Sequence, residues 1–274
     1  MLIAIARRSG IIVATVVVVA VSAILWPLEN SERRLAASGA KLCYALDETL
    51  LVGAKLEGEA FGDEQVQVAA SVSSMQRLSL AGSLVTQRGI QSLMLAKKLS
   101  SLNLSDTNLT SDALAIVCGF PLLRELELNR CGWLRDEHLS QLAALQKLEF
   151  LSLTGTSVTA VGMEHLRQVP ALKFVRLVDC RGIDDSSIDA VIRLCERRNL
   201  SIDLSGTEVT LQGLTRLRGA VPNGRIYFHP DSLVGLREIS QRGQFFQDQL
   251  GEIIGFRRKG DTDGTVIPLP GPVT

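Results

Sequence analysis

Apolar positions repeat along most of this chain with a period close to 24 residues. Each copy follows the pattern LxxLxLxxxx[LIV]xxxx[LIV]xx[LIV], in which most x positions are polar. When the second apolar position marks each copy, successive copies are 24, 24, 24, 25, 24, 27 and 24 residues apart. The marker residues are Ala54, Leu78, Leu102, Leu126, Leu151, Val175, Ile202 and Ile226. Eight copies in nearly constant register indicate a repeat protein.

Each copy predicts a strand, a turn, a helix and a second turn. The LxL core has period two, so both leucines lie on one face of a short strand. The later apolar spacing is helical and places its apolar residues on one face. One copy cannot bury its apolar face alone, so the copies must stack. The predicted fold class is therefore an α/β solenoid, with a parallel sheet on the concave side and helices on the convex side.

Several predicted helices begin with a residue that can accept a hydrogen bond from the first helical turn. Each of these residues directly follows the apolar residue that closes the turn. They are Thr86, Thr110, Thr159, Asp184 and Thr210.

Four stretches carry a family resemblance. They are LNLSDTNLTSDAL (102–114), LSLTGTSVTAVGM (151–163), LVDCRGIDDSSI (177–188) and DLSGTEVTLQGL (203–214). They resemble the leucine-rich-repeat family, specifically its cysteine-containing, ribonuclease-inhibitor-like branch, over roughly residues 51–228. The resemblance implies a solenoid whose concave sheet binds a protein or peptide. Together with an N-terminal membrane segment, the chain is also similar to uncharacterised exported bacterial leucine-rich-repeat proteins.

The chain has five cysteines and no CxxC spacing, so no disulfide framework is predicted. Cys131 and Cys180 occupy the place of Thr107, Thr156 and Thr207 in sister repeats. The resemblance implies that this side chain points inward and bonds to the turn backbone. Metal binding or redox activity is the alternative.

The N-terminal run GIIVATVVVVAVSAILWPL (10–28) contains no charged side chain. Nineteen helical residues span the roughly 30 Å hydrocarbon core of a bilayer, so we predict a transmembrane helix or signal anchor. Arg7 and Arg8 precede the run, which places residues 1–9 in the cytosol and the repeats on the extracytoplasmic side. The alternative is a signal peptide cleaved near residues 21–23, which exports the repeats as well.

The rest of the chain divides by composition into a solenoid and its flanks. Cys43 precedes the repeats and has no predicted role. The predicted ranges are 29–50, a linker and N-terminal cap with a short helix over 32–46; 51–231, a solenoid of about 7–8 repeats; 232–250, a C-terminal helical cap; and 251–274, a disordered tail.

Residues that flank the inward leucines of each strand face the concave side. Phe150 and Phe174 hold equivalent positions in adjacent strands, about 4.8 Å apart. Aromatic and arginine side chains are typical interface anchors. Alternatively, the two rings only pack on each other, or under a C-terminal segment. The predicted partner-binding residues are Phe150, Phe174, Arg176, Glu125, Glu127, Asp203, Arg225 and Tyr227.

Charge and motifs narrow the function. Lys and Arg total 29, as do Asp and Glu, so there is no basic excess to indicate a nucleic-acid partner. The motifs GxxxxGK[ST], GxSxG and HExxH and a Cys/His metal spacing are missing from the sequence. We therefore predict no catalytic residues, cofactor, metal or small-molecule substrate, and a membrane-anchored protein-interaction module. The alternatives are an envelope scaffold without a discrete ligand, and an adaptor that presents substrates to another enzyme.

Overall fold

The computed structural model describes residues 31–45, 50–196, 200–221, 225–228, 243–247, 253–258 and 267–268. The predicted cytosolic segment 1–9 and membrane segment 10–28 lie outside the described residues. Across the segments that are described, no helix has both the length and the apolar composition needed to cross a membrane.

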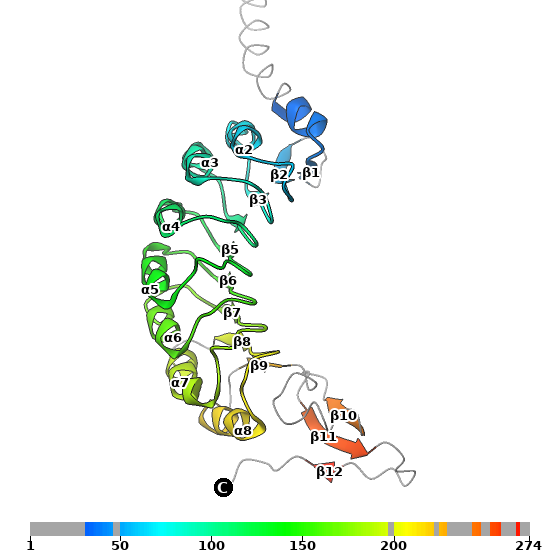
Figure 1. Cartoon of the computed structure of the whole chain (residues 1–274), viewed down its shortest axis with the longest axis vertical. Helices are drawn as coiled ribbons and strands as arrows, with labels where there is room; N and C mark the ends of the chain where they lie inside the picture. Colours follow the sequence, from blue (N-terminus) through cyan, green and yellow to red (C-terminus); the bar gives the residue numbers. More distant parts are fainter. Residues whose placement is uncertain are drawn as a thin grey trace, which may run out of the picture.

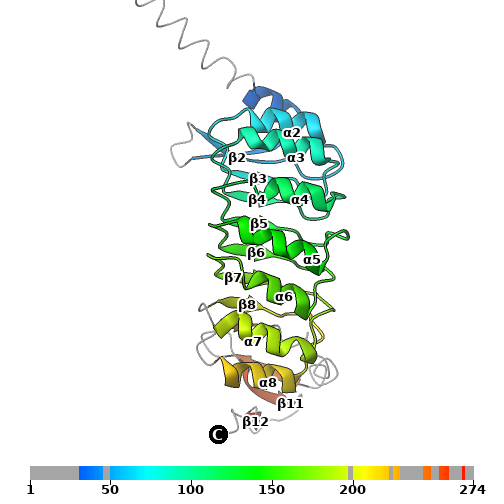
Figure 2. The same ribbon diagram turned by 90° about the vertical axis from the view of Figure 1, so that its left-hand side faces the viewer.

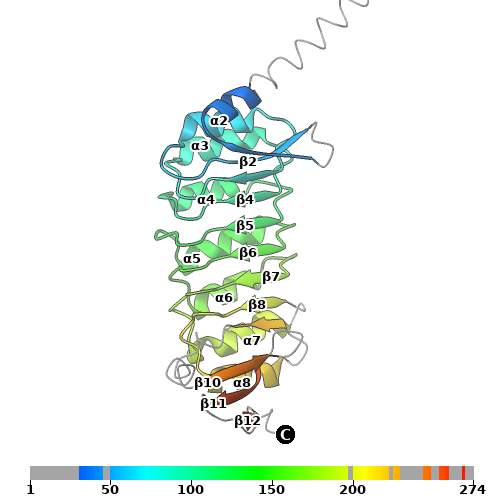
Figure 3. The same ribbon diagram turned by 90° about the vertical axis from the view of Figure 1, so that its right-hand side faces the viewer.

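The repeats form an arc with strands on its inner side and helices on its outer side (Figure 1). Figure 3 looks onto the strands and Figure 2 onto the stacked helices. One nine-stranded sheet runs in the order β1 to β9; β1 is antiparallel to β2, and every later pair is parallel. The strands are β1 Lys41–Tyr44, β2 Leu51–Lys55, β3 Arg77–Ser79, β4 Ser101–Asn103, β5 Glu125–Glu127, β6 Phe150–Ser152, β7 Phe174–Arg176, β8 Ser201–Asp203 and β9 Arg225–Tyr227.

Helices connect the strands on the convex side. The α-helices are α2 Asp63–Ala70, α3 Gln87–Ser92, α4 Ser111–Val117, α5 Asp136–Leu139, α6 Ala160–Leu166, α7 Ile188–Glu196 and α8 Leu211–Ala220. Short 3-10 turns are η1 Leu93–Leu95, η2 Ser140–Ala144 and η3 Asp185–Ser187. This alternation of parallel strands and helices confirms the predicted α/β solenoid.

The strand register follows the predicted repeat. Leu78 pairs with Leu102, and Leu102 in turn pairs with Leu126 of the next repeat. All eight marker residues pair in this way from β2 to β9. The insertions that lengthen two of the spacings therefore fall in the connections and leave the strand pairing intact.

The core is a continuous column of leucine and valine side chains between sheet and helices. Leu104, Leu128, Leu153 and Leu177 succeed one another along it and are at most 1% exposed. Burying a leucine side chain fully stabilises the fold by about 1.5–3 kcal/mol. Because each repeat supplies several such residues, stacking supplies the hydrophobic stabilisation that a single repeat lacks.

Four of the five predicted helix-capping residues act as predicted. Thr86, Thr159, Asp184 and Thr210 each accept a hydrogen bond from a backbone N–H of the first turn. Thr110 precedes α4 without such a bond.

Some of these threonines are also held by the preceding repeat. Asp136, the first residue of α5, accepts hydrogen bonds from the Thr159 backbone N–H (2.9 Å) and hydroxyl (2.5 Å). Gly162 leaves room for this carboxylate, since a Cβ there would lie 2.5 Å from Asp136 Oδ1. The same inter-repeat clamp recurs twice, as Asp63, Thr86 and Gly89 and as Asp185, Thr210 and Gly213.

Cys131 and Cys180 are buried next to the turns, as the resemblance implied. Thr107 donates its hydroxyl to the Leu104 carbonyl (2.6 Å), and the Cys131 thiol reaches the same carbonyl from the next repeat (3.3 Å). Cys180 likewise donates to the Leu153 carbonyl of the preceding repeat (3.0 Å). Both thiols therefore bond to backbone across a repeat boundary.

The N-terminal cap is a helix followed by a strand. Residues 31–37 are helical, and Leu35 of this helix is buried in the core. The predicted helix over 32–46 is wrong at β1, because Gly39, with φ +84°, turns the chain back after the helix. Strand β1 then pairs along the outer edge of β2 and covers backbone groups that an open edge would expose.

The C-terminal flank contains strands where a helical cap (232–250) and a disordered tail (251–274) were predicted. Strands β10 Gly243–Gln247, β11 Ile253–Arg258 and β12 Ile267–Pro268 form an antiparallel sheet at the C-terminal end of the solenoid (Figure 1). Both predictions are wrong at these strands. Aromatic and β-branched residues such as Phe245, Phe246 and Ile253 favour strands, and β10 and β11 satisfy each other's backbone. The remaining residues of both ranges lie outside the described part.

Candidate functional site

An aromatic pair stands on the concave face of β6 and β7. Phe150 and Phe174 pair directly in the sheet register. Their rings are stacked, with centroids 5.5 Å apart and planes 16° from parallel, and both side chains are half-buried. The sequence predicted this neighbourhood because one repeat period separates equivalent strand positions.

Arg176 lies over both rings. Its Cζ atom is 5.4 Å from the Phe150 centroid and 5.8 Å from the Phe174 centroid. A guanidinium at this distance from an exposed ring gains about 0.5–1 kcal/mol. Asp203, on the neighbouring strand β8, lies 3.9 Å from the Arg176 Nε atom. The arginine is therefore held between the ring pair and a carboxylate.

Tyr227 extends the aromatic row to β9. Its ring centroid lies 5.8 Å from that of Phe174, although β8 separates the two strands. Ser201, the β8 residue in register with Phe174, is too small to stand between the rings. Tyr227 remains 40% exposed. Phe150, Phe174, Tyr227 and Arg176 thus form one contiguous group, which we call the aromatic cluster.

Arg225 was predicted at the same face, but the structure leaves it outside the aromatic cluster. It is exposed on β9 and pairs in register with Ser201. Within the described part of the chain, it forms no ring contact or ion pair with the cluster.

Two carboxylates on β5 lie beside the aromatic cluster. Glu125 is exposed and in register with Phe150. Glu127 is half-buried, and its Oε2 atom accepts hydrogen bonds from the side-chain amides of Asn103 (3.3 Å) and Asn129 (3.2 Å). Over the described segments, neither carboxylate has a cation within 4.0 Å.

Asn129 also links Glu127 to the strand under the rings. Its Oδ1 atom accepts from the Ser152 hydroxyl (2.6 Å) and from the Thr154 backbone N–H (3.0 Å). The position of Glu127 is therefore fixed by a polar network that spans three repeats. The predicted site did not include Asn103 or Asn129. The sequence signal that could have identified them is an asparagine near Glu127. Asn103 is on the neighbouring strand β4, and Asn129 follows Glu127 by two residues.

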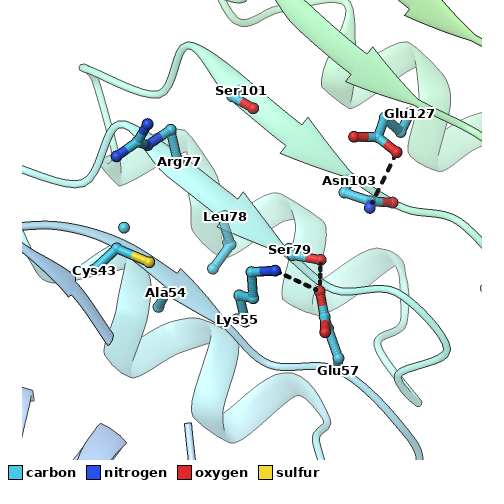
Figure 4. A pocket seen from close by; sticks show the side chains of 11 residues that line it. Cys43, Ala54, Lys55, Glu57, Arg77, Leu78, Ser79, Ser101, Asn103 and Glu127 are labelled. Carbon is cyan, nitrogen blue, oxygen red and sulfur yellow. Dashed lines mark hydrogen bonds and ion pairs between the residues drawn. The ribbon is translucent and has the colours of Figure 1, made fainter. Parts of the chain in front are cut away.

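A polar hollow of about 350 Å³ lies on the same face over β1 to β5 (Figure 4). Small side chains create it, since Gly53, Ser79 and Ser101 occupy strand positions where most later repeats carry larger residues. Lys55 lies 4.0 Å from Glu57, and the Ser79 hydroxyl donates to Glu57 (2.5 Å). The lining residues are Cys43, Gly53, Ala54, Lys55, Glu57, Arg77, Leu78, Ser79, Ser101, Asn103 and Glu127. The sequence did not predict this hollow.

Buried thiols are the most strongly perturbed titratable groups among the described residues. Burial raises the pKa of the Cys118 and Cys131 thiols to about 11 and that of Cys195 to about 12. Burial also raises the pKa of Cys180. A reactive cysteine requires a lowered pKa, so these thiols are packing residues. In the described segments, no three His, Cys, Asp or Glu residues gather in a way that would hold a metal ion.

The fold defines a class of protein. A repeat of about 24 residues with inner parallel strands and outer helices is the architecture of a leucine-rich-repeat solenoid. No family model and no curated protein matches the chain.

Two solved structures are similar to it. Internalin C2 from Listeria monocytogenes is 19% identical, with a TM-score of 0.43, over 64% of this chain and 80% of the internalin chain. An internalin named inlF from the same organism is 15% identical, with a TM-score of 0.43, over 59% of this chain and 50% of its own. These likenesses are distant, and nothing about the site follows from them.

Proposed function

We propose that this chain is a membrane-anchored protein-interaction module that binds a protein or peptide on its concave sheet. The apolar segment 10–28 anchors it, and the repeats lie on the extracytoplasmic side. The aromatic cluster supplies the main contact, flanked by Glu125, Glu127, Asp203 and Arg225.

The aromatic cluster is the observation that carries this proposal. Three rings and a guanidinium form one contiguous group on a sheet whose other outward residues are mostly polar. Rigid aromatic and arginine side chains lose little conformational entropy when they bind and dominate the energy of many interfaces. Binding, with no catalytic step, is the role that fits the cluster, because it brings no nucleophile and no pair of acid–base groups together.

Photocrosslinking from the cluster tests the proposal. The full chain, with p-benzoylphenylalanine in place of Tyr227, is expressed in its native cell and irradiated. We expect one recurrent protein adduct, which disappears when Phe150→Ala and Phe174→Ala are added, since losing two anchors weakens binding by at least about tenfold. The same photoprobe at Glu137, which is exposed on the convex helix α5, is the control and should not give that adduct.

The alternative of an envelope scaffold without a discrete ligand gives a different result. In that case the probe at position 227 yields no recurrent adduct, and the Phe150→Ala/Phe174→Ala variant changes nothing. Protease added to intact cells tests the topology separately. The proposed orientation exposes the repeats to external protease, whereas a cytosolic repeat domain would be protected.

A further inference from the structure

Phe150 lies at the β5 end of the aromatic cluster. Phe174 is stacked on it from β7, on the side opposite to β5. Arg176 Cζ lies 5.4 and 5.8 Å from the two phenylalanine centroids, which are themselves 5.5 Å apart. These three distances form a nearly equilateral triangle, so the guanidinium does not lie beyond Phe150 on its β5 side. The neighbours of Phe150 on that side are therefore residues of β5.

Two carboxylates on β5 stand next to the Phe150 ring. Glu125 is in register with Phe150, and Glu127 follows two residues later on the same side of β5. The two amide donors to Glu127 both bind Oε2, which leaves Oε1 without a hydrogen bond in the described part. A negative charge held in place beside an aromatic ring is complementary to a cation.

Positive and negative side chains occupy different parts of the concave face. Across the polar hollow from Glu127, Arg77 and Lys55 occupy β3 and β2 (Figure 4). Lys55 is already near Glu57, and Arg176 is already near Asp203. None of these cations reaches β5, so the carboxylates there lack a counter-charge from the described residues of this chain.

We infer that the Phe150 ring and the β5 carboxylates together bind an arginine or lysine side chain of the partner, next to an apolar residue that packs on the aromatic cluster. This inference rests on the proposed function and names the chemistry of its partner. The cation gains from the ring face and from both carboxylates. The row from β5 to β9 spans four strand intervals, on the order of 19 Å, which matches about six residues of extended peptide.

A random library of 12-residue linear peptides, selected on the full chain, tests this inference. We expect enrichment of peptides with Arg or Lys adjacent to Leu, Ile, Phe, Tyr or Trp. Selected peptides are then synthesised and their affinities measured by fluorescence anisotropy. Glu125→Gln/Glu127→Gln should weaken binding roughly tenfold, and Phe150→Ala/Phe174→Ala should weaken it further. Glu137→Gln, the same change on the convex side, should leave the affinity unchanged.

Replacing the peptide's arginine with neutral citrulline completes the cycle. We expect about the same loss of affinity with the wild-type chain and almost none with Glu125→Gln/Glu127→Gln, because the interaction is then already absent. Additive losses would place the cation elsewhere and overturn the inference.

The remaining outcomes separate the two proposals. Peptides that need Phe150 and Phe174 but show no basic preference would overturn the cation site and leave the binding function standing. A failure to select any peptide that depends on these rings would overturn both. Self-association of the chain that Glu125→Gln/Glu127→Gln abolishes, seen by sedimentation, would assign the site to a second copy and overturn the external partner.

Discussion

Aspartate and glycine residues vary together from repeat to repeat in this solenoid. Where a helix begins with Asp63, Asp136 or Asp185, the next repeat supplies a capping threonine and, three residues later, a glycine. Where the helix begins with another residue, that glycine is replaced. In these cases the first helical residue and the residue at the glycine position of the next repeat are Gln87 with Ala113, Ser111 with His138, and Ala160 with Ser187. The glycines are therefore present to accommodate a carboxylate and not to loosen the helix.

Gly213→Ala tests this interpretation directly. A Cβ there would lie 2.2 Å from Asp185 Oδ1, so the substitution should lower the free energy of unfolding by about 1–3 kcal/mol. In an Asp185→Ala background the clash is removed, and alanine is favoured over glycine inside a helix by about 1 kcal/mol. Gly213→Ala should then be neutral or stabilising. Urea unfolding of the four chains measures this coupling, and an equal cost in both backgrounds would contradict it.

The five cysteines should differ strongly in reactivity. Cys43 is half-buried at the rim of the polar hollow, whereas Cys131, Cys180 and Cys195 are buried. With a pKa of about 11, the Cys118 and Cys131 thiols are ionised to only roughly a thousandth at pH 8. We expect Ellman's reagent to modify one thiol quickly in the native chain and the others only as it unfolds. Cys43→Ser should remove the fast phase; a fast phase that persists would show that Cys118, the other half-buried thiol, or a buried thiol reacts as quickly.

At the scale of elements, the sequence predicted the strands that belong to the repeat. The register of β2 to β9 follows from apolar spacing alone, because each strand has an equivalent one period away. Strands β1, β10, β11 and β12 belong to no repeat, so the pattern contained no second copy against which to align them. Whether such a short segment forms a strand depends on the segment with which it pairs. Local composition does not identify that segment.

In the candidate site, likewise, contacts between equivalent repeat positions were predictable and other contacts were not. The contact between Phe150 and Phe174 was predictable because they are equivalent positions in adjacent strands. The contact between Phe174 and Tyr227 crosses a strand and depends on the small size of Ser201, which periodicity does not encode. The hollow over β1 to β5 also results from missing side-chain volume, and its β1 wall comes from a strand predicted as helix.

Glu164 joins two neighbouring helices through charge. It accepts from Arg167, the C-cap residue of α6 (2.8 Å), and from Arg193 Nε of α7 (2.6 Å). The Arg167 hydrogen bond first, and then Arg193, hold the pKa of Glu164 below its ordinary value of 4.5. Such a group stabilises the fold above pH 4.5, and the stabilisation is lost as pH falls through the lowered value.

Glu164→Gln should therefore reduce the free energy of unfolding at pH 7 by a small amount. The carboxylate is about a third exposed, so solvent screening limits the loss to roughly 0.5–1 kcal/mol. The difference from wild type should shrink as pH falls below 4.5. Thermal unfolding across pH 3 to 7 measures it, with Glu137→Gln as a matched surface control. A difference that stays constant with pH would mean that the loss is not electrostatic.

At the scale of the whole molecule, each repeat packs mainly on its two neighbours. A strand pairs with the strand before and after it, and each helix packs on adjacent helices, so stability is close to a sum of repeat and interface contributions. The position of a mutation along the arc should then decide whether it weakens the whole fold or only one end of it.

Leu128→Ala and Leu204→Ala separate these two behaviours. Both leucines are buried and equivalent, but Leu128 lies in the middle of the arc and Leu204 near its C-terminal end. Each truncation removes about 2–5 kcal/mol locally. A central repeat cannot open without breaking two interfaces, so Leu128→Ala should lower the unfolding midpoint in urea and leave the m-value unchanged. Leu204→Ala should let the end of the solenoid open first, which lowers the m-value and removes hydrogen-exchange protection only over the last repeats. Equal effects of both variants with unchanged m-values would show that the arc unfolds as one cooperative unit.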